Sequence, residues 1–302
     1  MPEQLSSKAS RYIVPREIRS DGLVEAVRFL KSFERDSKDD NILCESPIFV
    51  LSAGWRSGST LVQRLICSDN RILMWGEPFG DRIPICRLAS VIENIKEGDA
   101  HLRYSIDKFA GDLSKSWVAN LNPGVSSFLA AHRAYIENSF AYPALSEGFD
   151  RWGAKWVRLT AFHAEYLKWI YPEARFIFLV RHPLSAYRSY KVSRWYTVKP
   201  YYKVNNVFKF MAHWNYLGES FFNEKDRIGA MLIRYEDIHR ETQLLEKLEN
   251  YLGIQIRNDV LSHKVGARDK KGVRVYSWER YVCKLLTGST SRKLGYEILQ
   301  DE

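Results

Sequence analysis

A glycine-bearing segment, Ser52-Ala53-Gly54-Trp55-Arg56-Ser57-Gly58-Ser59-Thr60, has residue types suited to binding a phosphate group. It follows the apolar run 47–52 and precedes a helical pattern at 61–66. Two glycines give its backbone access to conformations that other residues rarely adopt, so successive N–H groups and a helix N-terminus can hold an anion. The segment predicts a phosphate-binding turn, here called the phosphate loop (residues 54–60), with candidate ligands Gly54, Trp55, Arg56, Ser57, Gly58, Ser59 and Thr60. A tight strand-to-helix turn without a ligand is the alternative.

The phosphate loop differs from the Walker A pattern of ATPases and GTPases in two respects. It has one residue fewer between its glycines, and no lysine precedes Ser59-Thr60. Because the Walker lysine reaches the β and γ phosphates, its absence favours a donor with a single 5' phosphate group. A nucleotide-dependent kinase with a degenerate loop is the competing hypothesis.

A second candidate for phosphate binding follows the apolar run 175–180. Arg181 comes directly after that run, and Pro183 marks the start of a helix. Ser189 follows Arg181 by eight residues, about two helical turns, so both side chains are expected on one side. The pair can hold one phosphate. Alternatively, the arginine caps a strand and the serine lies on a helix surface.

Glu77 is the candidate general base. It follows the weaker apolar run 72–75 and Gly76, at the expected carboxyl end of the second strand beside the phosphate loop. Transfer of a group to a hydroxyl needs a base within hydrogen-bond reach of that hydroxyl. A glutamate before Pro78 is also typical of an exposed turn, and that interpretation stays open.

These motifs resemble those of sulfotransferases that use 3'-phosphoadenosine-5'-phosphosulfate (PAPS). The phosphate loop resembles their 5'-phosphosulfate loop, in the R-S-G-[ST]-T form of tyrosylprotein and some bacterial carbohydrate sulfotransferases. Arg181 and Ser189 match the spacing of the family's 3'-phosphate motif, and Gly76-Glu77-Pro78 resembles its G-E segment. The resemblance covers roughly residues 46–255.

The resemblance implies transfer of a sulfuryl group from PAPS to an acceptor hydroxyl of a carbohydrate, a peptide tyrosine or a small alcohol or phenol. The product of the donor would be the bisphosphate PAP, and no metal would be needed. Arg56 would replace a family lysine that stabilises the transferring group, and Lys155 resembles a second lysine with that role. Other members use a histidine base, so His132 and His163 are alternatives to Glu77.

Further donor contacts are implied by the same resemblance. Tyr235 lies in a segment similar to the family's strand after the donor motif, where it either contacts the adenine or packs in the core. The basic segment 264–274 has the place of a family loop that closes on the 3' phosphate. Lys271 and Arg274 are therefore candidate ligands, against the default of a solvated charge run.

The elements that must position these residues alternate along the chain. Apolar runs at 47–52, 175–180 and 230–235, with weaker ones at 72–75 and 155–159, are typical of strands covered on both faces of a parallel sheet. Helical periodicity follows them at 61–66, 162–170, 207–222 and 244–252. This predicts an α/β three-layer sandwich with a central parallel sheet. The resemblance implies the P-loop NTPase-like sulfotransferase fold.

We expect a partly helical N-terminal lead-in over residues 1–45, with an amphipathic segment at 21–33, and one sulfotransferase domain over 46–302. Mostly helical sequence at 81–150 is expected to cap the carboxyl edge of the sheet and select the acceptor. A dense group of aromatic residues either lines an acceptor groove or makes core: Trp195, Tyr196, Tyr201, Tyr202 and Trp214.

The charge composition of the chain indicates which ligands it can attract. The 45 Lys and Arg residues outnumber the 36 Asp and Glu residues, and the formal charge of +9 favours an anionic ligand. A non-catalytic anion- or nucleic-acid-binding protein is thus a third hypothesis, although the resemblance favours a carbohydrate or phenolic acceptor.

The four widely spaced cysteines indicate neither a zinc site nor a disulfide framework. The sequence shows neither an apolar span nor a signal-like N-terminus, which predicts a cytoplasmic enzyme of bacterial type.

Overall fold

The structure is a computed structural model of the 302-residue chain. It describes residues 13–15, 19–32, 43–80, 84–93, 95–96, 121–193, 196–198, 202–262 and 274–297, together with the single residues 106, 114 and 119.

A five-stranded parallel sheet forms the centre of the molecule. Its strands are β1 (Ile48–Ser52), β2 (Ile72–Gly76), β3 (Arg151–Trp156), β4 (Arg175–Val180) and β7 (Met231–Arg234). Their order across the sheet is β2-β3-β1-β4-β7, and every pairing is parallel. Parallel neighbours need crossover connections, and helices supply them.

Both faces of the sheet are buried, which explains why its central strands are continuously apolar. In β1, Phe49 and Leu51 belong to the core on one face, whereas Ile48 and Val50 belong to the core on the other. In β4, the residues from Phe176 to Val180 divide between the two cores in the same alternating way. The three-layer α/β architecture predicted from the sequence is confirmed.

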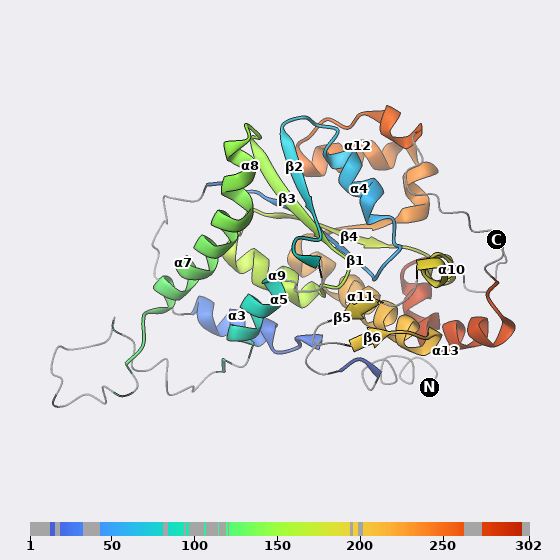
Figure 1. Ribbon diagram of the computed structural model, residues 1–302, viewed down its shortest axis with the longest axis horizontal. Helices are drawn as coiled ribbons and strands as arrows, with labels where there is room; N and C mark the ends of the chain where they lie inside the picture. Colours follow the sequence, from blue (N-terminus) through green and yellow to red (C-terminus); the bar gives the residue numbers. More distant parts are fainter. Residues whose placement is uncertain are drawn as a thin grey trace.

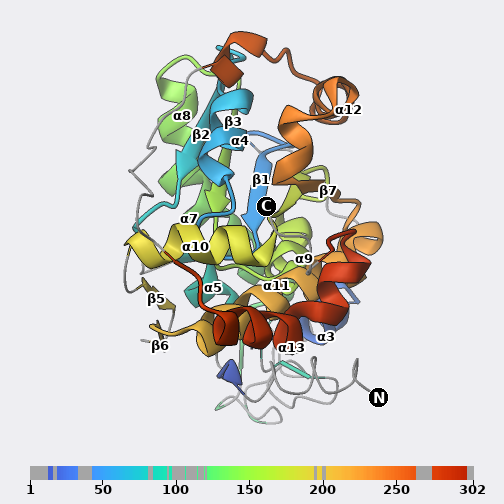
Figure 2. The same ribbon diagram turned by 90° about the vertical axis from the view of Figure 1, so that its right-hand side faces the viewer.

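Two helix layers cover the sheet (Figure 1). On one side lie α4 (Ser59–Ile66) and α12 (Thr242–Leu252). On the other lie α9 (Ala161–Ile170), α11 (Val207–Ile228), α3 (Leu23–Lys31) and α5 (Pro84–Ile92). Helix α13 (Ser277–Lys293) packs along α11, and α10 (Pro183–Ser193) contacts both (Figure 2). Among the described helices, none combines the length and the apolar character needed to cross a bilayer.

Smaller elements complete the described part of the chain. Residues 121–150 form α7 (Val125–Ile136), a π-helical turn η4 (Glu137–Ala141) and α8 (Tyr142–Ser146). An antiparallel hairpin pairs β5 (Tyr196–Val198) with β6 (Tyr202–Val204). Two 3-10 turns, η5 (Tyr235–His239) and η6 (Asn258–Ser262), flank α12.

Most predicted elements lie within a few residues of the observed ones, and one strand is misplaced. The sequence placed a strand at 155–159 with Lys155 at its start, but β3 spans Arg151–Trp156 and Lys155 lies near its carboxyl end. The error arose because β3 opens with Arg151 and contains Gly153, which interrupt the apolar pattern. Helix α13 was not predicted, and α3 in the predicted lead-in buries Leu23, Ala26, Val27 and Leu30.

The strand order places a switch point between β1 and β4. From β1 the chain crosses to β2 at one edge, whereas from β4 it crosses to β7 at the other. In open parallel sheets, ligands bind outside the carboxyl ends of the strands at such a point. The phosphate loop follows β1 and Arg181 follows β4, so both candidate motifs emerge at this crevice.

We predict that Gly153→Ala destabilises the fold. A Cβ at residue 153 would lie 2.3 Å from the backbone oxygen of Ile48 and 2.3 Å from the sulfur of Met74, and the strand backbone cannot give way. The free energy of unfolding is expected to fall by about 1–3 kcal/mol in urea titrations. Gly218→Ala in α11 is the control, because its new methyl meets neighbours at 3.3–3.4 Å and alanine favours a helix. Equal stability of the two variants would contradict this account of β3.

Candidate functional site

The phosphate loop is a strained turn between β1 and α4. Gly54 and Gly58 have φ of 82° and 91°, and Arg56 between them has φ of 64°. The amide of Ala53 donates to Leu179 O at 2.9 Å, which ties the start of the turn to β4. Helix α4 begins at Ser59, so its N-terminus opens directly onto the turn. Backbone N–H groups at such a terminus favour an anion.

Gly58 is required by close contact as well as by its backbone angle. A Cβ there would lie 2.0 Å from Cδ2 of Tyr235, so the aromatic ring packs directly on the glycine backbone. The same ring faces Arg181, whose guanidinium carbon lies 4.5 Å from the ring centroid. Tyr235 therefore joins the phosphate loop to the Arg181 segment through packing. Of the two interpretations of Tyr235, contact with a ligand stays a prediction.

Hydrogen bonds connect the two candidate motifs directly. Arg181 Nη1 donates to Arg56 O at 2.9 Å, and Arg56 Nε donates to Ser189 Oγ at 3.0 Å. Ser189 is buried on α10, two turns beyond Arg181, as its spacing predicts. The structure thus brings Arg56, Arg181 and Ser189 together at one end of the sheet.

Two buried polar atoms of this cluster lack an internal partner. Within the described ranges, neither Ser57 Oγ nor Arg181 Nε has a hydrogen-bond partner. Buried polar groups of native proteins are nearly always satisfied, so unmet donors at a candidate site fit a bound anion. A phosphate-bearing ligand therefore suits the residues present.

Glu77 lies at the carboxyl end of β2 and is held by cations on two sides. Lys155 Nζ lies 3.0 Å from Glu77 Oε1, and Arg158 Nη2 lies 3.8 Å from Glu77 Oε2. The amide of Glu77 also donates to Lys155 O at 3.0 Å. Lys155 and Arg158 are buried, whereas the Glu77 side chain keeps 29 % of its surface exposed. A carboxylate in this position is fixed in place and still accessible to a substrate.

Strand β3 lies between β2 and β1, so Glu77 and the phosphate loop follow strands that are not direct neighbours in the sheet. Arg158 bridges the gap, because its guanidinium carbon also lies 5.9 Å from the ring of Trp55. Sequence reasoning missed Arg158, which follows Lys155 by three residues and lies two residues past the end of the same strand.

A buried histidine of α11, His213, packs against the phosphate loop. The ring of His213 on α11 lies 5.3 Å from that of Trp55 with a 30° interplanar angle, and its Cδ2 would lie 3.8 Å from a Cβ at Gly54. Neither of its nitrogens has a hydrogen-bond partner in the described part of the chain. Burial, aided by the charge of Arg158, lowers the pKa of His213 from 6.5 to about 3. Its ring is therefore neutral at physiological pH.

The alternative bases are engaged inside the fold. His132 is buried, with Nδ1 2.7 Å from the Tyr166 hydroxyl, and burial lowers its pKa. His163 is buried at the start of α9, where its Nδ1 accepts the Thr160 amide. Glu77 is more accessible than either.

The aromatic residues predicted to line an acceptor groove or to make core differ in position. Trp214 belongs to the core, and its indole N–H donates to Arg181 O, whereas Tyr202 is half-buried. Trp195, Tyr201 and the side chain of Tyr196 lie outside the described residues.

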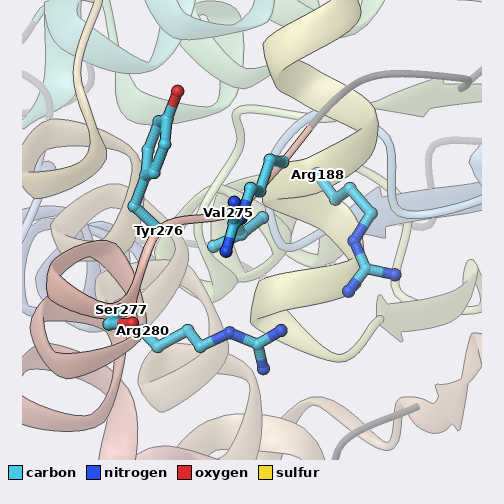
Figure 3. A pocket seen from close by; sticks show the side chains of 6 residues that line it. Arg188, Val275, Tyr276, Ser277 and Arg280 are labelled. Atoms are coloured by element: carbon cyan, nitrogen blue, oxygen red, sulfur yellow. The ribbon is translucent and has the colours of Figure 1, made fainter.

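The basic C-terminal segment is described only from Arg274 onward, so Lys271 lies outside the described residues. Arg274 lines a cavity of about 430 Å³ with Arg188 of α10 and Arg280 of α13. Figure 3 shows the Arg188 and Arg280 side chains extending into the same space from these two helices. Three guanidinium groups in one cavity favour an anionic occupant. Arg188 precedes Ser189 on α10, although neither Ser189 nor the phosphate loop lines the cavity.

The described residues contain no group of three or more His, Cys, Asp or Glu side chains arranged to hold a metal ion.

Comparison with known proteins identifies a family. The model described as the sulfotransferase family matches residues 47–258. Among solved structures, the chain is similar to the sulfotransferase STF9 from Mycobacterium avium, with 13 % identity, a TM-score of 0.40, and coverage of 91 % of this chain and 82 % of that one. No curated protein matches the sequence.

We predict that His213 makes the fold less stable in acid. Its folded pKa of about 3 is below the value of 6.5 for the unfolded chain, so protons bind preferentially to the unfolded state between these values. The contribution of His213 to the free energy of unfolding should therefore be complete above pH 6.5. As the pH falls below 6.5, this contribution should decrease by up to about 1.4 kcal/mol per pH unit.

Urea titrations of the wild type, His213→Phe and the exposed control His239→Gln at pH 7 and pH 5 test this prediction. Between these pH values the wild type and the control should each lose about 2 kcal/mol more than His213→Phe. Parallel losses in all three proteins would show that His213 is not the group responsible.

Proposed function

The chain belongs to the sulfotransferase family, and on that premise we propose that it transfers a sulfuryl group from PAPS to an acceptor hydroxyl, with Glu77 as the general base. The observation that carries the proposal is the joining of the two phosphate motifs: Arg181 bonds to the backbone of Arg56, and Arg56 bonds to Ser189. A donor with a phosphate at each of the 3' and 5' positions suits two adjacent anion sites.

The proposed donor site divides into two ends. The amides of the phosphate loop and the hydroxyls of Ser57, Ser59 and Thr60 bind the 5' phosphosulfate, with Gly54 and Gly58 admitting the close backbone approach. Arg181 and Ser189 bind the 3' phosphate. The unmet donors of Ser57 and Arg181 support this division, because each would gain a partner from the ligand.

Three further residues complete the donor site in this proposal. Tyr235 contacts the adenine, which its position against Gly58 and Arg181 favours. Arg274 and Lys271 close on the 3' phosphate from the C-terminal segment. Arg274 lines a cavity with Arg188 and Arg280, and three guanidinium groups in one cavity support a role for Arg274 in binding an anion.

In the proposed reaction, the oxygen of the acceptor hydroxyl bonds to the sulfur of the donor. Glu77 accepts the proton that this hydroxyl loses. The bond between sulfur and the bridging phosphate oxygen breaks, and PAP leaves. Arg56 and Lys155 stabilise the negative charge that shifts onto the sulfuryl and bridging oxygens. Arg56 Nε bonds to Ser189 Oγ at 3.0 Å and its guanidinium carries further N–H donors, and Lys155 Nζ lies 3.0 Å from the base. Positioning and charge stabilisation would supply most of the catalysis, as in phosphoryl transfer.

The position and the exposure of the Glu77 carboxylate support its proposed role as the base. Arg158 and Lys155 hold its carboxylate in place, and 29 % of the side-chain surface stays exposed. The acceptor would approach from the exposed side of Glu77. The helical segments within 81–150 are proposed to form part of that approach.

We predict that PAP stabilises the protein more than AMP or ATP at equal concentration. A ligand at 100 times its dissociation constant adds about 2.7 kcal/mol to the free energy of unfolding, which thermal shift detects. Arg181→Gln and Ser189→Ala should weaken PAP at least about tenfold and AMP much less, because the lost contact is with the 3' phosphate. Arg274→Gln should act in the same direction.

The exposed arginine variant Arg240→Gln is the control and should bind PAP as the wild type does. Preference for ATP in the presence of magnesium would favour a kinase instead. Unchanged PAP affinity in Arg181→Gln would refute the assignment of the 3' phosphate site.

We predict that Glu77→Gln loses turnover by about 10²–10⁴-fold, the usual contribution of a general base, while PAP affinity stays within about twofold. Turnover is measured with radiolabelled PAPS and whichever of 4-nitrophenol and methyl glucoside supports activity. Glu147→Gln, an exposed carboxylate on the surface, is the matched control with the same change of charge. Retained turnover in Glu77→Gln would remove Glu77 as the base.

A further inference from the structure

The segment that carries Glu77 is a tight turn with unusual backbone angles. The amide of Gly80 donates to Glu77 O at 2.9 Å and closes a turn over residues 77–80. Its second position is Pro78 and its third is Phe79, with φ of 58°. A proline followed by a positive φ is the signature of a type II turn, in which the third position is normally glycine or asparagine.

Phenylalanine at this position is unfavourable in two ways. A positive φ is strained for a bulky side chain. In addition, the Phe79 side chain is 61 % exposed, so it gains little from burial. Of the four non-glycine residues with positive φ in the described ranges, three are Arg56, Glu77 and Phe79. Strain of this kind persists where the surroundings impose it and is concentrated at functional sites.

Several contacts fix the backbone of the turn, and one contact involves the Phe79 ring. Arg158 Nη2 donates to Gly80 O at 2.8 Å and also lies 3.8 Å from Glu77 Oε2. The Glu77 amide is bonded to β3 through Lys155 O. The ring of Phe79 lies 6.1 Å from that of buried Phe140, in the π-helical turn η4. Such turns are frequent at functional sites.

We propose that Phe79 is a specificity-determining residue of the acceptor site, and that the acceptor presents a ring with an apolar face to it. The inference rests on the proposed function, because Phe79 is two residues from the proposed base. A ring that stacks on Phe79 is held beside Glu77, so a hydroxyl on that ring is positioned for proton transfer. Phenolic and sugar rings both present an apolar ring face, and acyclic alcohols lack one.

Substitution by glycine separates a role in folding from a role in binding. In Phe79→Gly the backbone strain is relieved, so the melting temperature should stay within about 2 °C of the wild type or rise. PAP affinity should be unchanged. The KM for a ring acceptor should rise at least about threefold, the value of a lost aromatic contact, whereas Phe79→Tyr should retain the wild-type KM.

The experiment measures melting temperature, PAP affinity and steady-state kinetics with 4-nitrophenol, methyl glucoside and 1-hexanol. Binding of the same probes to the PAP complex is followed by saturation-transfer NMR. Tyr281→Ala, a variant at a 67 % exposed aromatic on α13, is the control and should leave KM unchanged.

The proposal is supported if a ring probe binds or reacts in preference to 1-hexanol and Phe79→Gly weakens it selectively. It is overturned if KM and probe binding are unaffected in Phe79→Gly, if no ring probe binds the PAP complex, or if Phe79→Gly mainly lowers the melting temperature. Failure of PAP to stabilise the wild type would instead refute the proposed function itself, so the two failures are distinguishable.

Discussion

Residue 58 must lack a side chain, because the ring of Tyr235 occupies the space where a Cβ would stand. This contact sets how closely the turn after β1 can approach the segments after β4 and β7. The close approach lets Arg181 reach the backbone of Arg56 and lets Arg56 reach Ser189. The other groups of the candidate site are arranged around this junction, which forms where the parallel strand order reverses.

Positive charge is concentrated around the junction. Arg56, Lys155, Arg158 and Arg181 gather at the carboxyl edge of the sheet, and the carboxylate of Glu77 pairs with two of them. Charges in a partly buried site interact more strongly than in water, so the excess of cations favours an anionic ligand. Neutral His213 beneath the loop adds no further charge, and its low pKa follows from the same burial that strengthens the field.

The sequence was informative where burial on both faces left a strong pattern. The strands β1, β4 and β7 were predicted closely because their apolar runs are continuous. Helix α13 was missed because Thr287, Gly288, Ser289, Thr290 and Ser291 have weak helix propensity and are stabilised by packing against α11. Arg158 was missed because its role depends on contacts with Gly80 and Trp55. These two residues lie in separate turns that come together only in the folded protein. The motifs themselves were recognisable because their spacing is local.

The central claim is that the phosphate loop and the Arg181–Ser189 pair bind the two ends of one nucleotide. The most direct measurement is a crystal structure of the protein with PAP. The account predicts the 5' phosphate against the loop amides and the 3' phosphate within hydrogen-bond distance of Arg181 and Ser189. A 3' phosphate in solvent, or PAP bound away from the crevice between β1 and β4, would contradict it.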